Sequence, residues 1–174
     1  MREWFLEQLA MYAAYHRDLR NQATHHVGVP LIVYALMLAL TQIPIIASVS
    51  AATIVIILLL GFYLVNVPLV GGLAVLIYGI LYGVAARVGE AGADVVWSTF
   101  AACFVGGWII QFIGHVFEGR RPALFDNAVQ VFMAPPFLIA ELLFVFGAAQ
   151  DLAAQIDRRH KKYLPSSTPI HNAR

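Results

Sequence analysis

Charge is scarce in this 174-residue chain and is missing from long stretches of it. Charged residues make up 12% of the sequence, against about 25% in an ordinary soluble domain. No Asp, Glu, Lys or Arg occurs between Arg20 and Arg87, a gap of 66 residues, and shorter gaps cover 95–117 and 127–140. A bilayer core about 30 Å thick is crossed by roughly 20 apolar residues in a helix, so the first gap alone can hold about three spans. A soluble fold is therefore excluded, and the sequence predicts a polytopic membrane protein.

Cysteine is also nearly absent. Cys103 is the single cysteine and lies in an apolar segment, so the chain has no disulfide framework. The formal net charge is only +1, which gives no support to a nucleic-acid partner. The partner that the composition does indicate is the lipid bilayer.

The N-terminal segment predicts an amphipathic helix over Glu3–Leu19. Its apolar positions recur at spacings of 4, 3, 4 and 3 and so share one helical stripe. These positions are Phe5, Leu9, Tyr12, His16 and Leu19. Residues 20–30 are expected to form a connector, with the next helix beginning near Gly28-Val29-Pro30.

The remaining apolar segments predict an all-α bundle of about four full spans. We expect the spans at about 29–47, 50–66, 69–87 and 95–117. A fifth apolar segment, 128–149, contains Pro135-Pro136, and we expect these prolines to break it. Residues 1–150 are expected to form a single membrane-embedded domain, and 151–174 a polar, basic tail.

Basic residues indicate the orientation, since positive charge favours the cytoplasmic side of a membrane. Three arginines precede the first span, Arg120 and Arg121 follow the fourth, and five Lys or Arg lie in the tail. Four spans plus a broken fifth segment keep all three groups on the cytoplasmic side.

Four of the six histidines are predicted to meet at one membrane face. His16, His25 and His26 precede the first span and His115 lies near the exit of the fourth, so an even number of crossings returns the chain to the same side. Asn21 and His25 are spaced i,i+4 and can share a helix face. His160 and His171 lie in the polar tail, where we expect them to be solvated.

A polar stripe on the fourth span supports this prediction. Trp108, Gln111, His115 and Glu118 recur at spacings of 3, 4 and 3, and a polar stripe on a membrane helix should face the bundle interior. Glu141 is the one charge in the last apolar segment and is a functional candidate for the same reason. The glycines near this stripe are expected to be close-packing positions. They are Gly106, Gly107 and Gly114.

Converging imidazoles are typical ligands of iron, zinc, copper or nickel, and the sparse carboxylates argue against calcium or magnesium. Other interpretations remain open at this point. A lone intramembrane histidine often bonds a backbone carbonyl, and Glu118 can pair with Arg120 or Arg121. A transporter should place polar residues along several spans, whereas the second and third spans are almost wholly apolar. A non-catalytic metal-binding protein or scaffold is a further alternative.

Three blocks of the sequence resemble the 2-hydroxy-palmitic acid dioxygenase family, a small family of membrane proteins. The blocks are Tyr15-His16 with Asn21, His25 and Val29-Pro30; then Trp108 to Asn127; then Ala134-Pro135-Pro136-Phe137 with Glu141. The match covers residues 12 to about 145. Membrane hydroxylases and desaturases with two irons have about eight clustered histidines, which this chain lacks.

The resemblance implies an iron(II)-dependent dioxygenase without an organic cofactor. It would cleave a 2-hydroxy fatty acid with O₂ to the fatty acid one carbon shorter, with Fe(2+) held by His16, His25 and His115. We expect Glu118 as a fourth ligand, because it lies one helical turn beyond His115.

The head group of such a substrate would chelate the metal, and its acyl chain would lie among the spans. Candidates for binding the head group are Arg120, Arg121 and Asn21. The membrane is expected to be the inner membrane of a bacterium or the endoplasmic reticulum of a eukaryote, with the site at the cytoplasmic face.

Overall fold

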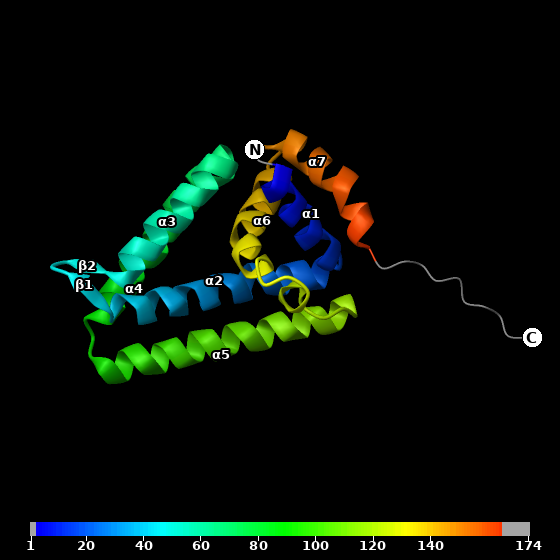
Figure 1. Cartoon of the computed structure of the whole chain (residues 1–174). Helices are drawn as coiled ribbons and strands as arrows, with labels where there is room; N and C mark the ends of the chain where they lie inside the picture. The colour runs from blue at the N-terminus through cyan, green and yellow to red at the C-terminus, as the bar shows by residue number, and fades with distance from the viewer. Residues whose placement is uncertain (1–2, 165–174) are drawn as a thin grey trace, which may run out of the picture.

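The computed structural model describes residues 3–164 and consists mainly of helices (Figure 1). In chain order the elements are α1 (Glu3–Tyr15), α2 (Leu19–Thr41), β1 (Pro44–Ile46), β2 (Val49–Ser50), α3 (Ala51–Asn66), α4 (Pro68–Gly89), α5 (Ala93–Glu118), the 3-10 helix η1 (Ala123–Phe125), α6 (Gln130–Val145), α7 (Gln150–His160) and the 3-10 helix η2 (Lys161–Tyr163). The two short strands form an antiparallel hairpin between α2 and α3. The predicted all-α class is confirmed.

Three of the helices, α2, α4 and α5, are long and apolar enough to cross a membrane. Helices α3 and α6 are apolar but have 16 residues each, which gives a length of about 24 Å, less than a hydrocarbon core of about 30 Å. Large apolar side chains such as Ile57 on α3 and Leu76 on α4 are exposed, as expected for helices that face lipid. The chain is therefore a helical protein whose length and composition suit a membrane.

Helices α2 and α5 run side by side along the length of the molecule (Figure 1). A Cβ added at Gly28 of α2 would lie 2.9 Å from the backbone oxygen of Gly107 on α5, and one at Gly114 would clash with Thr24. The expected close-packing role is thus confirmed for Gly107 and Gly114, and it is wrong for Gly106, where an added Cβ meets nothing within 4 Å. The antiparallel pair brings the start of α2 beside the end of α5.

The connector expected over 20–30 is wrong, because α2 already begins at Leu19 and continues through Pro30. The Asp18 side chain caps this helix by accepting a hydrogen bond from the backbone N–H of Arg20 at 2.8 Å. Asn21 and Thr24 in this first part of α2 contact Glu118 and Gly114 of α5, so these polar residues belong to the helix despite their low hydropathy. The span expected at 29–47 ends earlier than expected, because α2 ends at Thr41 and the hairpin begins with β1 at Pro44.

The break expected in the fifth apolar segment is also wrong, because α6 is one helix that includes Pro135 and Pro136. Pro136 has no N–H for the carbonyl of Phe132, four residues earlier. The hydroxyl of Tyr63 on α3 donates to that carbonyl at 2.8 Å. A neighbouring helix therefore satisfies the backbone group that the proline leaves free.

Helix α1 packs between α6 and α7 at one end of the bundle (Figure 1). The expected stripe is buried at Phe5, Leu9 and Tyr12, but Leu19 is 77% exposed because α1 ends at Tyr15. Helix α7 buries Leu152 and Ile156, and both belong to the same hydrophobic cluster as Phe5. Residues 151–164 are thus docked on α1, and the division of the chain at residue 150 stays a prediction.

Candidate metal centre

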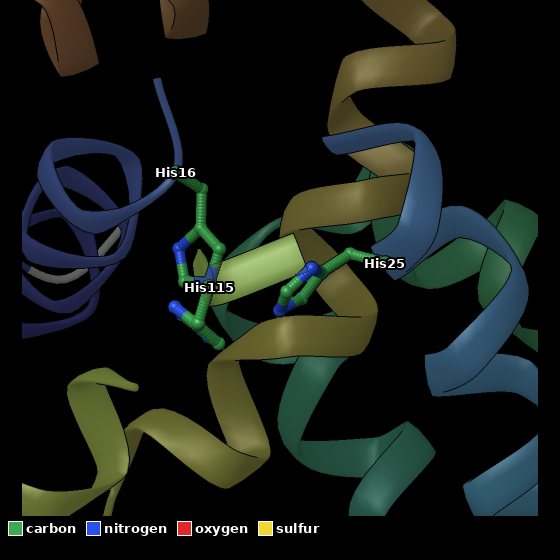
Figure 2. A group of neighbouring side chains, drawn as sticks. All are labelled: His16, His25 and His115. Atoms are coloured by element: carbon green, nitrogen blue, oxygen red, sulfur yellow. The ribbon is translucent and has the colours of Figure 1, made fainter. Parts of the chain in front are cut away.

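The imidazoles of His16, His25 and His115 point toward one another at the end of the bundle where α2 begins and α5 ends (Figure 2). Their ligand atoms lie within 4.8 Å of one another, and the ring centroids are 4.5 to 5.2 Å apart. All three residues are at most 7% exposed. The predicted meeting of these three histidines at one end of the molecule is confirmed.

Backbone carbonyls fix the orientation of all three rings. Each Nδ1 lies within hydrogen-bond distance of a carbonyl oxygen, and a carbonyl can only accept, so Nδ1 carries the proton and the lone pair is on Nε2. Partners of this kind orient the imidazole ligands of metal sites. The pairs are His16 with Tyr12 at 2.7 Å, His25 with Asn21 at 2.9 Å, and His115 with Arg120 at 3.1 Å.

The cluster fits a transition-metal ion. Burial, together with the charge that a protonated His25 would carry, lowers the pKa of His16 well below its usual range, so this imidazole is neutral and has its lone pair available. Metal–nitrogen bonds of about 2.1 Å place ligand nitrogens roughly 3 to 4 Å apart, close to the separation found here. Three imidazoles also leave coordination positions for other ligands.

Glu118 lies beside the cluster, and its carboxylate is not among the grouped ligand atoms. It accepts hydrogen bonds from the backbone N–H groups of Arg17 at 3.0 Å and Asp18 at 2.9 Å, and from Nδ2 of Asn21 at 2.9 Å. These contacts attach the turn that carries His16 to the end of α5. Glu118 therefore holds His16, a candidate metal ligand, in position. This structural role explains why Glu118 lies beside the cluster.

The expected head-group residues are bound to other parts of the protein. Arg120 donates to the backbone carbonyls of Ala14 at 3.1 Å and Tyr163 at 3.3 Å, and Arg121 forms an ion pair with Asp126. Asn21 is fully buried and donates to the Glu118 carboxylate, as described above. The structure thus brings these residues close to the histidines but gives each of them a protein partner.

An apolar cavity adjoins His16 and His25, with walls from α2, η1, α5 and α6. Val29, Ile32 and Leu36 form its α2 wall, which extends about 16 Å from His25 at 1.5 Å per residue. Among the residues that the structure describes, no Asp, Glu, Lys or Arg lines this cavity. Its apolar lining suits an acyl chain.

Two polar residues of the cavity wall were not among the predicted site residues. Gln111 lies on the predicted polar stripe of α5, and Gln130 begins α6. Gln130 stands out in the sequence only as an amide within a segment that is otherwise nearly all apolar. That feature alone does not distinguish a residue of the cavity wall from a solvated residue at the end of a helix.

His26 and Glu141 contact each other away from the cluster. The His26 Nε2 lies 3.3 Å from a Glu141 carboxylate oxygen, which joins α2 to α6. Successive helical residues point about 100° apart, so His25 can face the cluster while His26 faces α6. His160 bonds to its own helix through the Asp157 carbonyl, and His171 lies outside the described residues.

Fold and site together define a helical protein with three helices able to cross a membrane and a three-histidine cluster beside an apolar cavity. Comparison with known proteins gives its family. The model of the 2-hydroxy-palmitic acid dioxygenase Mpo1-like family matches residues 3–146. The 2-hydroxy-palmitic acid dioxygenase MPO1 of Saccharomyces cerevisiae is 35% identical over 155 residues, which cover 86% of each chain. The chain belongs to the Mpo1-like family. No solved structure matches it at a significant level.

Proposed function

We propose that this protein is an iron(II)-dependent dioxygenase that cleaves 2-hydroxy fatty acids with O₂ to the fatty acid one carbon shorter, a step of fatty acid α-oxidation. The observation that carries the proposal is the set of three buried imidazoles, each held through Nδ1, beside an apolar cavity. Membership in the Mpo1-like family supports the substrate class, because the yeast relative is named for 2-hydroxy-palmitic acid.

The three histidines would hold the iron, and bound iron(II) would supply the redox chemistry with O₂ at positions that the protein leaves open. The carbonyls of Tyr12, Asn21 and Arg120 keep each Nε2 directed at the site. The apolar wall along α2 would take the acyl chain and exclude water from its length. Glu118 acts as a positioning residue that holds the His16 turn against α5.

We place the site at the cytoplasmic face, in the inner membrane of a bacterium or the endoplasmic reticulum of a eukaryote. Arg20 and Arg120 lie at the same end of the bundle as the histidines, and α7, which carries Arg158 and Arg159, packs on α1 at that end. Positive charge is retained on the cytoplasmic side. The substrate would enter from the bilayer, with its head group near this face.

The test uses the full chain in lipid nanodiscs, loaded with iron(II) and given 2-hydroxyhexadecanoic acid and O₂. Mass spectrometry should find pentadecanoic acid formed in proportion to bound iron. Hexadecanoic acid, which lacks the 2-hydroxyl, should remain unchanged. Bound iron without product would favour the non-catalytic metal-binding alternative, and equal consumption of both acids would contradict the proposed substrate class.

A further inference from the structure

Gln111 lines the cavity with a side-chain amide that has no hydrogen-bond partner in the described part of the chain. It is 7% exposed, lines the cavity on α5, and lies one helical turn before His115. Its side chain makes no hydrogen bond to any residue within 3–164. The amide atoms are not fully enclosed by protein, so they are free to bond a ligand in the cavity that the residue lines.

Packing between α2 and α5 holds Gln111 near His25. A Cβ added at Gly28 would lie 3.1 Å from Cγ and 3.5 Å from Cδ of Gln111. The missing side chain at Gly28, one turn beyond His25, therefore makes the room that Gln111 occupies. The amide is positioned where a group bound at the histidines would meet it.

Gln130 contributes a second amide, and its orientation follows from a chain of hydrogen bonds. The backbone N–H of Val129 donates to Oδ1 of Asn127 at 3.0 Å, so the Asn127 Nδ2 must be the donor to Oε1 of Gln8 at 2.7 Å. That oxygen also accepts from Nε2 of Gln130 at 2.9 Å. The Gln130 Oε1 is left buried, without a donor in the described part of the chain.

The two amides have complementary needs for hydrogen bonds. The amide of Gln111 can donate to a carboxylate, and the free oxygen of Gln130 can only accept, as from a hydroxyl. A 2-hydroxy acid carries both groups on adjacent carbons. Apart from the proposed metal, the described lining holds no cationic side chain to bind the carboxylate, and Arg120 and Arg121 have partners elsewhere.

We propose that Gln111 binds the carboxylate of the substrate and that Gln130 accepts a hydrogen bond from its 2-hydroxyl, so that two neutral amides select a 2-hydroxy acid. This inference rests on the proposed function and names the residues that determine its specificity. A site built to bind a hydroxyl rejects an analogue that lacks it, because the buried protein group is then left unpaired.

The experiment measures binding to zinc-loaded protein in nanodiscs, where no turnover occurs. Titration calorimetry compares 2-hydroxyhexadecanoic acid with hexadecane-1,2-diol, which lacks the carboxylate, and with hexadecanoic acid, which lacks the hydroxyl. In Gln111→Leu and the milder Gln111→Asn, the preference for the hydroxy acid over the diol should fall about tenfold or more. In Gln130→Met, the preference over hexadecanoic acid should fall while the preference over the diol is kept.

Asn66→Leu is the matched control, because Asn66 is also a buried amide with an unpartnered oxygen but lies on α3 and does not line the cavity. Its affinity ratios should equal those of the unmodified protein, and zinc content should be the same in all variants. Unchanged ratios in both Gln111 variants, or equal changes in Asn66→Leu, would overturn the inference. Failure of the unmodified protein to bind any of the three lipids would instead contradict the proposed function.

Discussion

At the residue scale, two adjacent histidines have different surroundings. His25 faces His16 and His115, whereas His26 contacts Glu141. We expect His25→Ala to remove most of the metal and all turnover, because it deletes one of three ligands. His26→Ala should reduce activity modestly and leave metal content unchanged, as measured by elemental analysis and product formation. The reverse pattern would assign the ligand to His26.

Glu118 offers a second test at this scale. Gln keeps the size of the side chain but has one accepting oxygen in place of two and no charge, so it weakens the set of hydrogen bonds from Arg17, Asp18 and Asn21. We expect Glu118→Gln to fold and to lose 10- to 100-fold in metal affinity or turnover, as partners of metal ligands typically do. Glu90→Gln, at an exposed site, is the control. Full activity with full iron in Glu118→Gln would contradict this role.

The sequence predicted the histidine cluster because an even number of crossings determines which side of the membrane each residue reaches. It did not predict the partners of Arg120, since the carbonyl of Tyr163 reaches it only after α7 and η2 dock. Gln130 was missed for a similar reason. Its place in the cavity wall depends on how α6 packs, which periodicity within a single segment cannot show.

At the scale of elements, the closeness of α2 and α5 determines whether the site assembles. A Cβ at Gly107 would lie 2.7 Å from Ile32 and 2.9 Å from the Gly28 oxygen, whereas one at Gly106 meets nothing. We expect Gly107→Ala to destabilise the protein by about 1–3 kcal/mol and to weaken metal binding, because it pushes the helix that carries His115 away from α2. Gly106→Ala is the matched control and should leave thermal stability and metal content nearly unchanged. Equal effects of the two variants would contradict the close-packing account.

Element boundaries were predicted well where apolar runs end at glycine or charge, as at α4 and α5. They were predicted poorly where tertiary contacts override local preference. Pro136 would break an isolated helix, but Tyr63 supplies the missing hydrogen bond from α3. The start of α2 was missed because its polar residues, of which Asn21 and His25 are buried, resemble a connector in a hydropathy profile.

At the scale of the whole molecule, we expect the docking of α7 and η2 on α1 to depend on pH. Hydrogen bonds from Lys162 and Tyr163 hold the pKa of Glu7 below its ordinary value of 4.5. Since the folded pKa is lowered, the ionised carboxylate stabilises docking above the unfolded value, and this contribution is lost as pH falls through the folded value. Spin labels on α1 and α7 should therefore separate as the pH is lowered below about 4.5.

Glu7→Gln provides the control for this prediction. Gln cannot ionise, so docking in the variant should be weaker at neutral pH and should change less between pH 6 and pH 3. A separation of the labels that is identical in both proteins across this range would assign the pH dependence to another group, such as Asp126, whose pKa is also lowered, mainly by the hydrogen bond from Tyr15.

The most direct test of the central claim is X-ray absorption spectroscopy of the iron-loaded full chain, beside His115→Ala. The account predicts scattering from three imidazoles, with iron–nitrogen distances of about 2.1 Å, because the ligand atoms lie within 4.8 Å of one another and each Nδ1 is bonded to a carbonyl, which leaves the Nε2 lone pair for the metal. In His115→Ala the spectrum should show fewer imidazoles and much less bound iron. A spectrum with fewer than three imidazoles in the unmodified protein, or full iron with an unchanged spectrum in the variant, would contradict it.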